Sequence, residues 1–270
     1  MLAASLAAAL VVYAAGVARV WRHAGVGRGV TGLQAAAFIS GWFVLVGALS
    51  GPMDELTDRW LVAHMAQHEL LIVVAAPLFA FGAPLVAALW SLPARARIRA
   101  AGAVRSRRVE TTWMALSAPA TVFVLHAAAL WIWHLPALYD RALQSEGLHV
   151  LEHLCFFGTA ALFWWGIAHG RYGRAGYGAA VVYVFATAAH SGVLGALLTV
   201  SPKVLYAPYL IAHPSGVTPL EDQQLAGLLM WVPAGVAFVA GALVLFAAWL
   251  RQSDRMTRFQ PAPTGREVVE

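Results

Sequence analysis

The sequence has little charge. Charged residues make up 11% of its 270 residues, hydrophobic residues make up 60%, and the mean hydropathy is +0.69. A soluble domain of this size cannot cover its surface with so few charges. The composition therefore excludes a water-soluble globular protein and indicates a polytopic membrane protein. The length suits one compact helical bundle rather than several domains.

The sequence also has almost no cysteine and lacks the common catalytic motifs. Cys155 is the only cysteine, so an intrachain disulfide and a CxxC motif are excluded. No Ser-His-Asp set, HExxH motif or P-loop is present, and the glycine-rich GVGRGVTG joins two apolar segments without the strand-turn-helix setting of a nucleotide loop. These absences favour a non-enzymatic role, although they leave enzymatic activity undecided.

What the sequence does have is a series of long apolar segments. A helix that crosses the hydrocarbon needs about 20 mostly apolar residues. Seven segments meet this requirement, and the predicted fold is an all-α bundle of seven transmembrane helices; the segments are 2–20, 31–50, 61–90, 111–133, 148–168, 177–200 and 223–250. The third segment is long enough to tilt, and Pro77, Gly82 and Pro84 are expected to kink it. In the first segment the arginines follow the apolar stretch, so we interpret it as a retained span rather than a signal peptide.

Basic residues predict the direction of these spans. Of the 18 Lys and Arg, 15 fall on one side of the predicted membrane: Arg19, Arg22, Arg28, Arg95, Arg97, Arg99, Arg105, Arg107, Arg108, Arg171, Arg174, Arg251, Arg255, Arg258 and Arg266. Positive residues stay cytoplasmic, so we expect the N-terminus outside and the C-terminus inside. The net charge of +5 is then a topology signal and not a nucleic-acid surface. Residues 1–250 form one transmembrane domain in this interpretation, and 251–270 form a disordered cytoplasmic tail.

Histidines gather at the predicted outer side, and four of them form two pairs with the same spacing. His64 and His68 begin the third span in HMAQH, and His149 and His153 begin the fifth in HVLEH. Residues four apart lie on one face of a helix, and both pairs lie just below the outer interface. If these two spans pack together, four imidazoles converge. Ionisable groups inside a membrane usually mark a functional site.

This arrangement predicts a metal or haem site. Imidazole-rich coordination without paired thiolates suits copper or zinc, whereas magnesium and calcium prefer oxygen ligands. Gln67 and Glu152 each precede the second histidine of a pair and could orient an imidazole by accepting its other N–H; Glu152 could equally pair with Arg141. Met65 and Cys155 are expected to pack in the core.

Several stretches together resemble one family: HMAQHELLIVVAAPLFAFGAP, WIWHLPALYDRAL, HVLEHLCFFGTAALFWW and PLEDQQLAGLLMWVP. The chain is similar to the multi-span CtaG-type cytochrome c oxidase assembly factors of bacteria, from the second span to the seventh. The resemblance implies a seven-span plasma-membrane protein that helps to mature a haem-copper oxidase, with copper handling as the usual proposal. It carries functional positions onto His64, His68, His134, His149, His153, Glu221, Asp222 and Gln223. Glu69 stands where an apolar residue is typical of the family, so the resemblance assigns it no role.

The sequence therefore predicts a multi-pass protein of the bacterial plasma membrane that binds copper at its outer face and assists metallation of cytochrome c oxidase. The ligands would be His64, His68, His149 and His153, with His134 or His126 in addition. Asp222 either faces this site or caps the seventh span. The partners would be an oxidase subunit or a copper donor protein, within the lipid bilayer and without nucleic acid.

Three alternatives remain at this stage. His126 and His190 lie deep enough to be axial ligands of haem in a membrane redox protein. A copper transporter would need a polar path across the bilayer, to which only the same two histidines could contribute. A purely structural assembly partner would bind no metal at all.

Overall fold

The computed structural model of the chain describes residues 2–170, 176–210 and 216–258, and over these ranges it contains helices and no strand. The first half of the chain forms α1 (Leu2–Ala24), α2 (Gly32–Leu49), α3 (Pro52–Thr57), α4 (Leu61–Glu69), the π-helix η1 (Leu70–Ala75), α5 (Ala76–Phe81), α6 (Pro84–Ser91) and α7 (Ala94–Val104). The second half forms α8 (Arg107–Leu116), α9 (Pro119–Trp133), α10 (Pro136–Leu143), α11 (Glu146–Ala168), α12 (Gly176–Val200), the short 3₁₀-helix η3 (Ala207–Tyr209) and α13 (Pro219–Arg258).

The helices confirm an all-α fold with six to seven candidate membrane spans over the described residues. Six are long and apolar enough to cross a bilayer, and α8 with α9 makes a seventh span if this pair, which is bent by 58°, is counted as one. Of the predicted tail, residues 251–258 continue α13 as helix, and 259–270 lie outside the described residues. Arg171, Arg174 and His213 also lie outside them.

The third span is shorter than predicted. It ends at Phe81 instead of continuing to residue 90. Ala83 has a left-handed backbone (φ 51°) directly before Pro84, and proline disfavours a helical conformation in the residue before it. The chain therefore breaks at Gly82 and Ala83, and α6 is a separate helix that packs against α1, where Gly16 approaches the backbone of Ala87.

Within the third span, the helix widens just after its histidines. The six residues of η1 follow Glu69, and the amide of Ala76 bonds to the carbonyl of Leu71, five residues back. Pro77 has no N–H to continue the regular pattern, and π turns of this kind are frequent at functional sites. The indole N–H of Trp164, in α11, donates to the carbonyl of Ile72 at 2.9 Å. This bond ties the two predicted ligand-bearing spans together.

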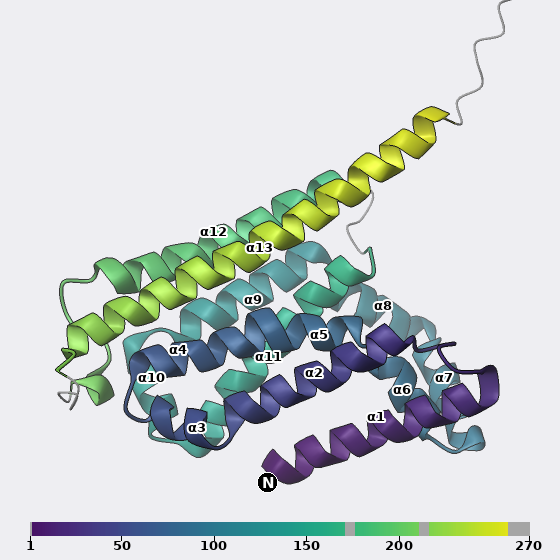
Figure 1. Cartoon of the computed structure of the whole chain (residues 1–270), viewed down its shortest axis with the longest axis horizontal. Helices are drawn as coiled ribbons and strands as arrows, with labels where there is room; N and C mark the ends of the chain where they lie inside the picture. The colour runs from purple at the N-terminus through teal and green to yellow at the C-terminus, as the bar shows by residue number, and fades with distance from the viewer. Residues whose placement is uncertain (1, 171–175, 211–215, 259–270) are drawn as a thin grey trace, which may run out of the picture.

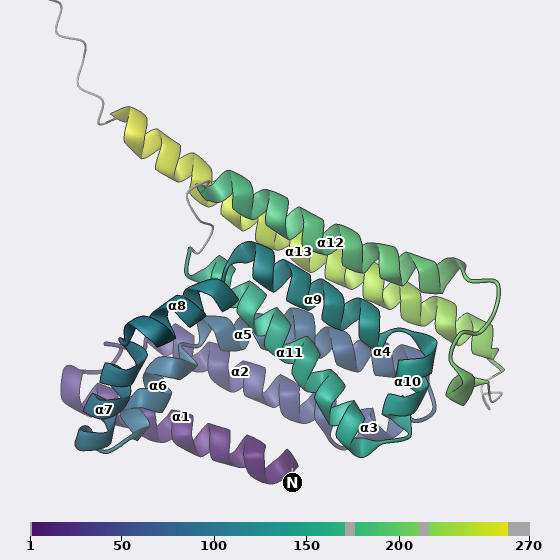
Figure 2. The ribbon, with the colours of Figure 1, turned by 180° about the vertical axis from the view of Figure 1, so that it is seen from behind.

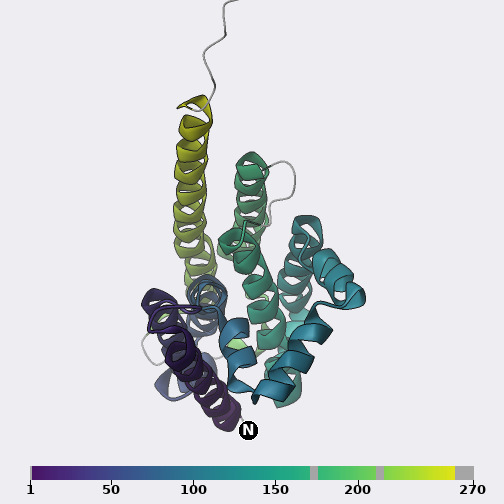
Figure 3. The ribbon, with the colours of Figure 1, turned by 90° about the vertical axis from the view of Figure 1, so that its right-hand side faces the viewer.

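The helices form a bundle with two distinct ends (Figure 1). Helices α12 and α13 lie side by side, and α1, α2 and α6 lie on the opposite side of α4, α5 and α11 (Figures 1 and 2). One end carries α3 and α10, where α4 and α11 begin; the other carries α7 and α8. The C-terminal part of α13 extends beyond the other helices, as Figure 3 shows from the side. The arginines of α7 and α8 thus lie far from the start of α4 and α11. Which end faces the cytoplasm stays a prediction.

Candidate metal centre

Four histidines from two helices meet at the end of the bundle that carries α3 and α10. Helix α4 supplies His64 and His68, and α11 supplies His149 and His153. Each offers a ring nitrogen, and these four nitrogens lie within 4.8 Å of one another. The ring centroids of His64 and His149 are 5.1 Å apart, and those of His68 and His153 are 5.2 Å apart. The two predicted pairs therefore converge on one spot; that they bind a metal stays a prediction.

Burial sets this cluster apart from ordinary interfacial histidines. His64 and His68 are 0% and 1% exposed, whereas His149 and His153 are half-buried. Three ring nitrogens are buried without a hydrogen-bond partner among the described residues: Nδ1 of His68, Nε2 of His149 and Nε2 of His153. A buried polar atom without a partner costs about 1–3 kcal/mol, so such atoms are rare in folded proteins. A ligand shared among these imidazoles would give such nitrogens a partner.

Tyr209 determines which nitrogen of His64 is available. The tyrosine hydroxyl lies 3.0 Å from Nδ1 of His64 and donates to the carbonyl of Thr57 at 2.7 Å. Because this hydroxyl has only one proton, it must accept from Nδ1–H of His64. The lone pair of His64 is therefore on Nε2, which lies 3.0 Å from Nε2 of His68. Orienting an imidazole through its other nitrogen is how proteins usually prepare a histidine ligand.

Replacing Tyr209 with phenylalanine is expected to lower the copper affinity about 10- to 100-fold, the usual effect of losing such an orienting bond. The matched control is Tyr206→Phe, because the Tyr206 hydroxyl donates to the carbonyl of His134 at 3.0 Å and touches no ring nitrogen. Competition with a chromophoric copper chelator measures both affinities. Equal affinities in the two variants would show that Tyr209 does not orient a ligand.

His134 is a fifth nitrogen donor beside the cluster. Its Nδ1 lies 2.7 Å from the carbonyl of Leu130, an acceptor, so Nδ1 carries the proton and Nε2 is bare. This Nε2 is buried without a partner in the described part of the chain, and the ring centroid lies 6.0 Å from that of His68. His126 is not part of this centre. It precedes His134 by two helical turns, about 12 Å along the axis.

Glu152 lies inside the cluster, whereas Gln67 faces away from it. Glu152 is 0% exposed, and its Oε1 is 3.9 Å from Nε2 of His68. Arg141 is exposed, so the alternative pairing of Glu152 with Arg141 is wrong. Gln67 is one residue before His68, so its side chain points about 100° away from that of His68 around the helix. Its amide donates instead to the carbonyl of Ala48 at the end of α2, at 2.7 Å. The expectation that Gln67 orients an imidazole is therefore wrong in this structure.

The LEDQ segment at the start of α13 builds the frame around the histidines. Glu221 and Thr218 exchange hydrogen bonds in a capping box for α13 itself. Asp222 caps a different helix: its carboxylate accepts from the backbone N–H of Leu61 at 2.7 Å and of Val62 at 3.1 Å, at the start of α4. Both earlier interpretations of Asp222, as a residue facing the metal and as the cap of its own span, are replaced by this one.

Gln223 holds the segment that covers the centre. Its side-chain oxygen accepts from the backbone N–H of Leu205 at 2.7 Å, and its amide donates to the carbonyl of Lys203 at 3.1 Å. This positions Tyr206 and Tyr209, which are 1% and 2% exposed. Burial raises the pKa of both tyrosines, so their hydroxyls remain donors at neutral pH. The sequence indicated only a proline-rich outer segment here and gave no signal for the two tyrosines.

The donor set fits an ion that prefers nitrogen. In a tetrahedral site with metal–nitrogen distances of about 2.0–2.1 Å, the ligand nitrogens lie about 3.3 Å apart. The four imidazoles offer nitrogens within 4.8 Å of one another, and those of His64 and His68 are 3.0 Å apart, so the separations are in the range of such a site. Imidazole suits copper and zinc, and one buried carboxylate next to four histidines is too little oxygen for calcium or magnesium.

The chain is similar in sequence to known proteins. A family described as cytochrome c oxidase caa3 assembly factor matches residues 11–252. Two curated relatives, the uncharacterized proteins Mb0105 of Mycobacterium bovis and MT0111 of Mycobacterium tuberculosis, are each 27% identical over 233 residues, which is 82% of this chain. The chain spans about a third of the length of these relatives, 34% in each case. No solved structure matches.

Proposed function

Because the chain belongs to the cytochrome c oxidase caa3 assembly factor family, we propose that it holds copper between α4 and α11 and delivers it to a haem-copper oxidase. The ligands are His64, His68, His149 and His153, with His134 beside them. The protein is a multi-span membrane protein, and we place it in the bacterial plasma membrane with this centre on the extracytoplasmic side. Copper is the cargo here and not a resident cofactor.

The observation that carries this proposal is the convergence of four ring nitrogens within 4.8 Å. Copper is favoured over zinc by the family to which the chain belongs. Haem-copper oxidases contain copper, so a factor that serves one has a use for this ion, whereas imidazole is a common ligand of both metals. Neutral imidazoles with one carboxylate nearby also limit the charge that the site must bury.

The two pairs of histidines differ in access, which suits a site that passes its ion on. His64 and His68 are buried, whereas His149 and His153 are half-buried. Asp54 and Glu55, in α3, and Asp58, which follows it, lie at the same end of the bundle. We propose that copper exchanges between a partner and the α11 histidines, and that α4 holds it more deeply. The partner is an oxidase subunit or a copper donor protein.

Changing His64, His68, His149 and His153 to alanine is expected to reduce the copper bound to the protein by about one ion per chain. The reason is that His134 alone cannot hold the ion. The measurement is elemental analysis of the purified protein after loading with copper and removal of excess.

The control is the double variant His23→Ala/His169→Ala, which removes two exposed histidines away from the centre and is expected to keep its copper. If the four-histidine variant, still monodisperse in detergent, held as much copper as the control, the proposed function would be wrong. Cells that depend on the oxidase provide the second measurement, because the four-histidine variant should lower oxidase activity and the control should not.

A further inference from the structure

A second pair of histidines lies deeper in the bundle, apart from the centre described above. His126 in α9 and His190 in α12 face each other with ring centroids 6.1 Å apart. His126 precedes His134 by about 12 Å along α9. His126 is 1% exposed, and His190 is half-buried. The two rings therefore lie within the bundle, at a depth where polar side chains are costly to keep.

Hydrogen bonds determine the tautomer of His126. Its Nδ1 lies 2.9 Å from the hydroxyl of Thr159. That hydroxyl lies 2.7 Å from the carbonyl of Cys155, to which it donates its one proton. It must therefore accept from Nδ1–H of His126, so the lone pair of His126 is on Nε2. The hydroxyl of Thr159 thus orients His126 in the same way as the hydroxyl of Tyr209 orients His64, and Nε2 is left available as a ligand.

Neither ring nitrogen of His190 has a hydrogen-bond partner in the ranges that the structure describes, and both nitrogens are buried. The ring packs edge-on against Phe123, at 5.3 Å. A polar group left without a partner in an apolar environment costs several kcal/mol. A ligand shared with Nε2 of His126 would remove this cost for one of the two nitrogens.

The spacing of the two rings fits a single ion between them. Each nitrogen of an imidazole lies about 1 Å from the ring centre, so an ion about 2 Å from one nitrogen of each ring separates the centres by about 6 Å. The two centroids are 6.1 Å apart. A direct hydrogen bond between the rings is not present in the structure. The distance between the two rings therefore leaves room for one ion held by a nitrogen of each.

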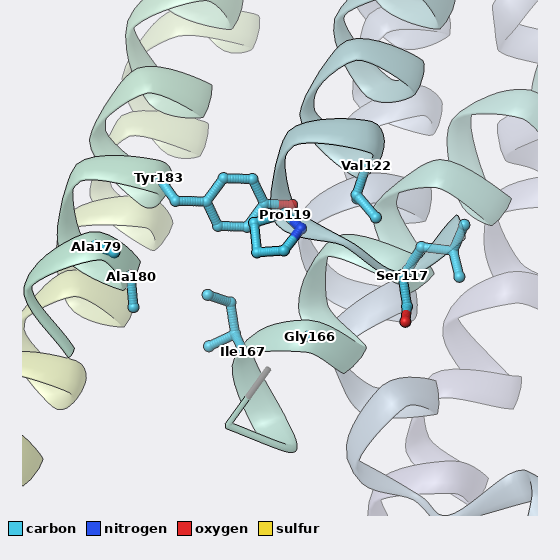
Figure 4. A pocket seen from close by; sticks show the side chains of 9 residues that line it. Ser117, Pro119, Val122, Gly166, Ile167, Ala179, Ala180 and Tyr183 are labelled. Carbon is cyan, nitrogen blue, oxygen red and sulfur yellow. The ribbon is translucent and has the colours of Figure 1, made fainter. Parts of the chain in front are cut away.

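Aromatic side chains pack against the pair. Phe163 packs against His126, with centroids 6.4 Å apart, and against Tyr183, at 4.9 Å. Val122, one helical turn before His126 in α9, lines a separate cavity of about 30 Å³ together with Tyr183 and small or apolar residues of α11 and α12 (Figure 4). A cavity of this size holds a water molecule or two.

We propose that His126 and His190 form a second copper site, specific for Cu(I), in the interior of the membrane. Cu(I) tolerates two ligands and carries a single charge, whereas a divalent ion would bring a much larger desolvation penalty into this apolar region. Neither ring has a carboxylate hydrogen-bonded to it among the described residues. An ion held there is shielded from water and stays reduced. This site does not require the outer centre to be occupied.

The test is an anaerobic titration of the full-length protein in detergent with Cu(I), against a competing chromophoric chelator. The wild type is expected to bind about two ions per chain. His126→Phe and His190→Phe, which keep a ring in each place, should each bind one, and the ion that remains at the outer centre reports that the variant is folded. His23→Phe, an exposed control, should bind two.

The outer-centre variant with four alanines separates this inference from the proposed function. It should still bind one Cu(I), and its copper-edge X-ray absorption spectrum should show two-coordinate geometry with nitrogen ligands. If His126→Phe and His190→Phe bind as many ions as the wild type, the inner site does not exist, whatever the outer centre does. A Soret band in the wild type that these two variants lose would also overturn the proposal, because it would assign the pair to haem.

Discussion

Replacing Asp222 with alanine is expected to destabilise the protein by about 2–4 kcal/mol and to lower its copper affinity at least tenfold. Asp222 is fully buried and caps α4 through the N–H groups of Leu61 and Val62. Trp60, the N-cap residue of α4, makes no such bond with its side chain. The loss of a cap costs about 0.5–2 kcal/mol, and each buried N–H left without a partner adds about 1–3 kcal/mol.

The effect on copper follows from the position of His64, which begins the second turn of the helix that Asp222 caps. Fraying of the first turn of α4 would move His64 away from Tyr209 and from the other ligands. Thermal unfolding in detergent and chelator competition measure the two effects. Glu221→Ala is the matched control, since this exposed neighbour caps α13 alone; a smaller loss of stability and unchanged copper binding are expected. Equal losses in both variants would refute the role assigned to Asp222.

Replacing Gly227 with leucine is expected to prevent close packing of α12 against α13. A Cβ at Gly227 would lie 2.5 Å from the carbonyl oxygen of Gly195 and 2.6 Å from the backbone nitrogen of Thr199. The two helices therefore meet backbone to backbone, as membrane helices do at small residues. Because backbone atoms cannot rotate away, we expect a loss of more than about 3 kcal/mol, beyond ordinary overpacking of a core.

The same substitution should also damage the copper centre, since Asp222 and Gln223 begin the helix that would shift. Gly235→Leu is the matched control: it lies two turns further along α13, and a Cβ there meets nothing within 4 Å. Size-exclusion profiles and thermal unfolding of the two variants provide the comparison. We expect the control to behave like the wild type. If Gly227→Leu did so too, the close contact between α12 and α13 would not exist.

The spans and the two histidine pairs with their matching depth could be predicted because both depend on local periodicity. Hydropathy over about 20 residues locates a membrane helix, and a spacing of four places His64 beside His68 and His149 beside His153. The two pairs begin spans that run in the same direction, so they lie at the same depth. That the two spans pack together, and so bring the pairs to one spot, is shown only by the structure.

The parts that could not be predicted depend on contacts between distant segments. Asp222 caps α4, although it is 161 positions away from Leu61 in the chain. From the sequence alone, a carboxylate at the start of a helix is expected to cap its own helix. The break at Ala83 requires a left-handed alanine that composition does not reveal. Tyr206 and Tyr209 lie at the two ends of the short helix η3, and only the three-dimensional structure shows that they reach His134 and His64.

The most direct test of the copper centre is the position of the ion itself. Crystals of the copper-loaded protein, with diffraction data collected at the copper absorption edge, would locate it by anomalous scattering. We expect one peak about 2 Å from ring nitrogens of at least three of His64, His68, His149 and His153. Strong copper peaks elsewhere in the molecule, with none among these imidazoles, would contradict the account.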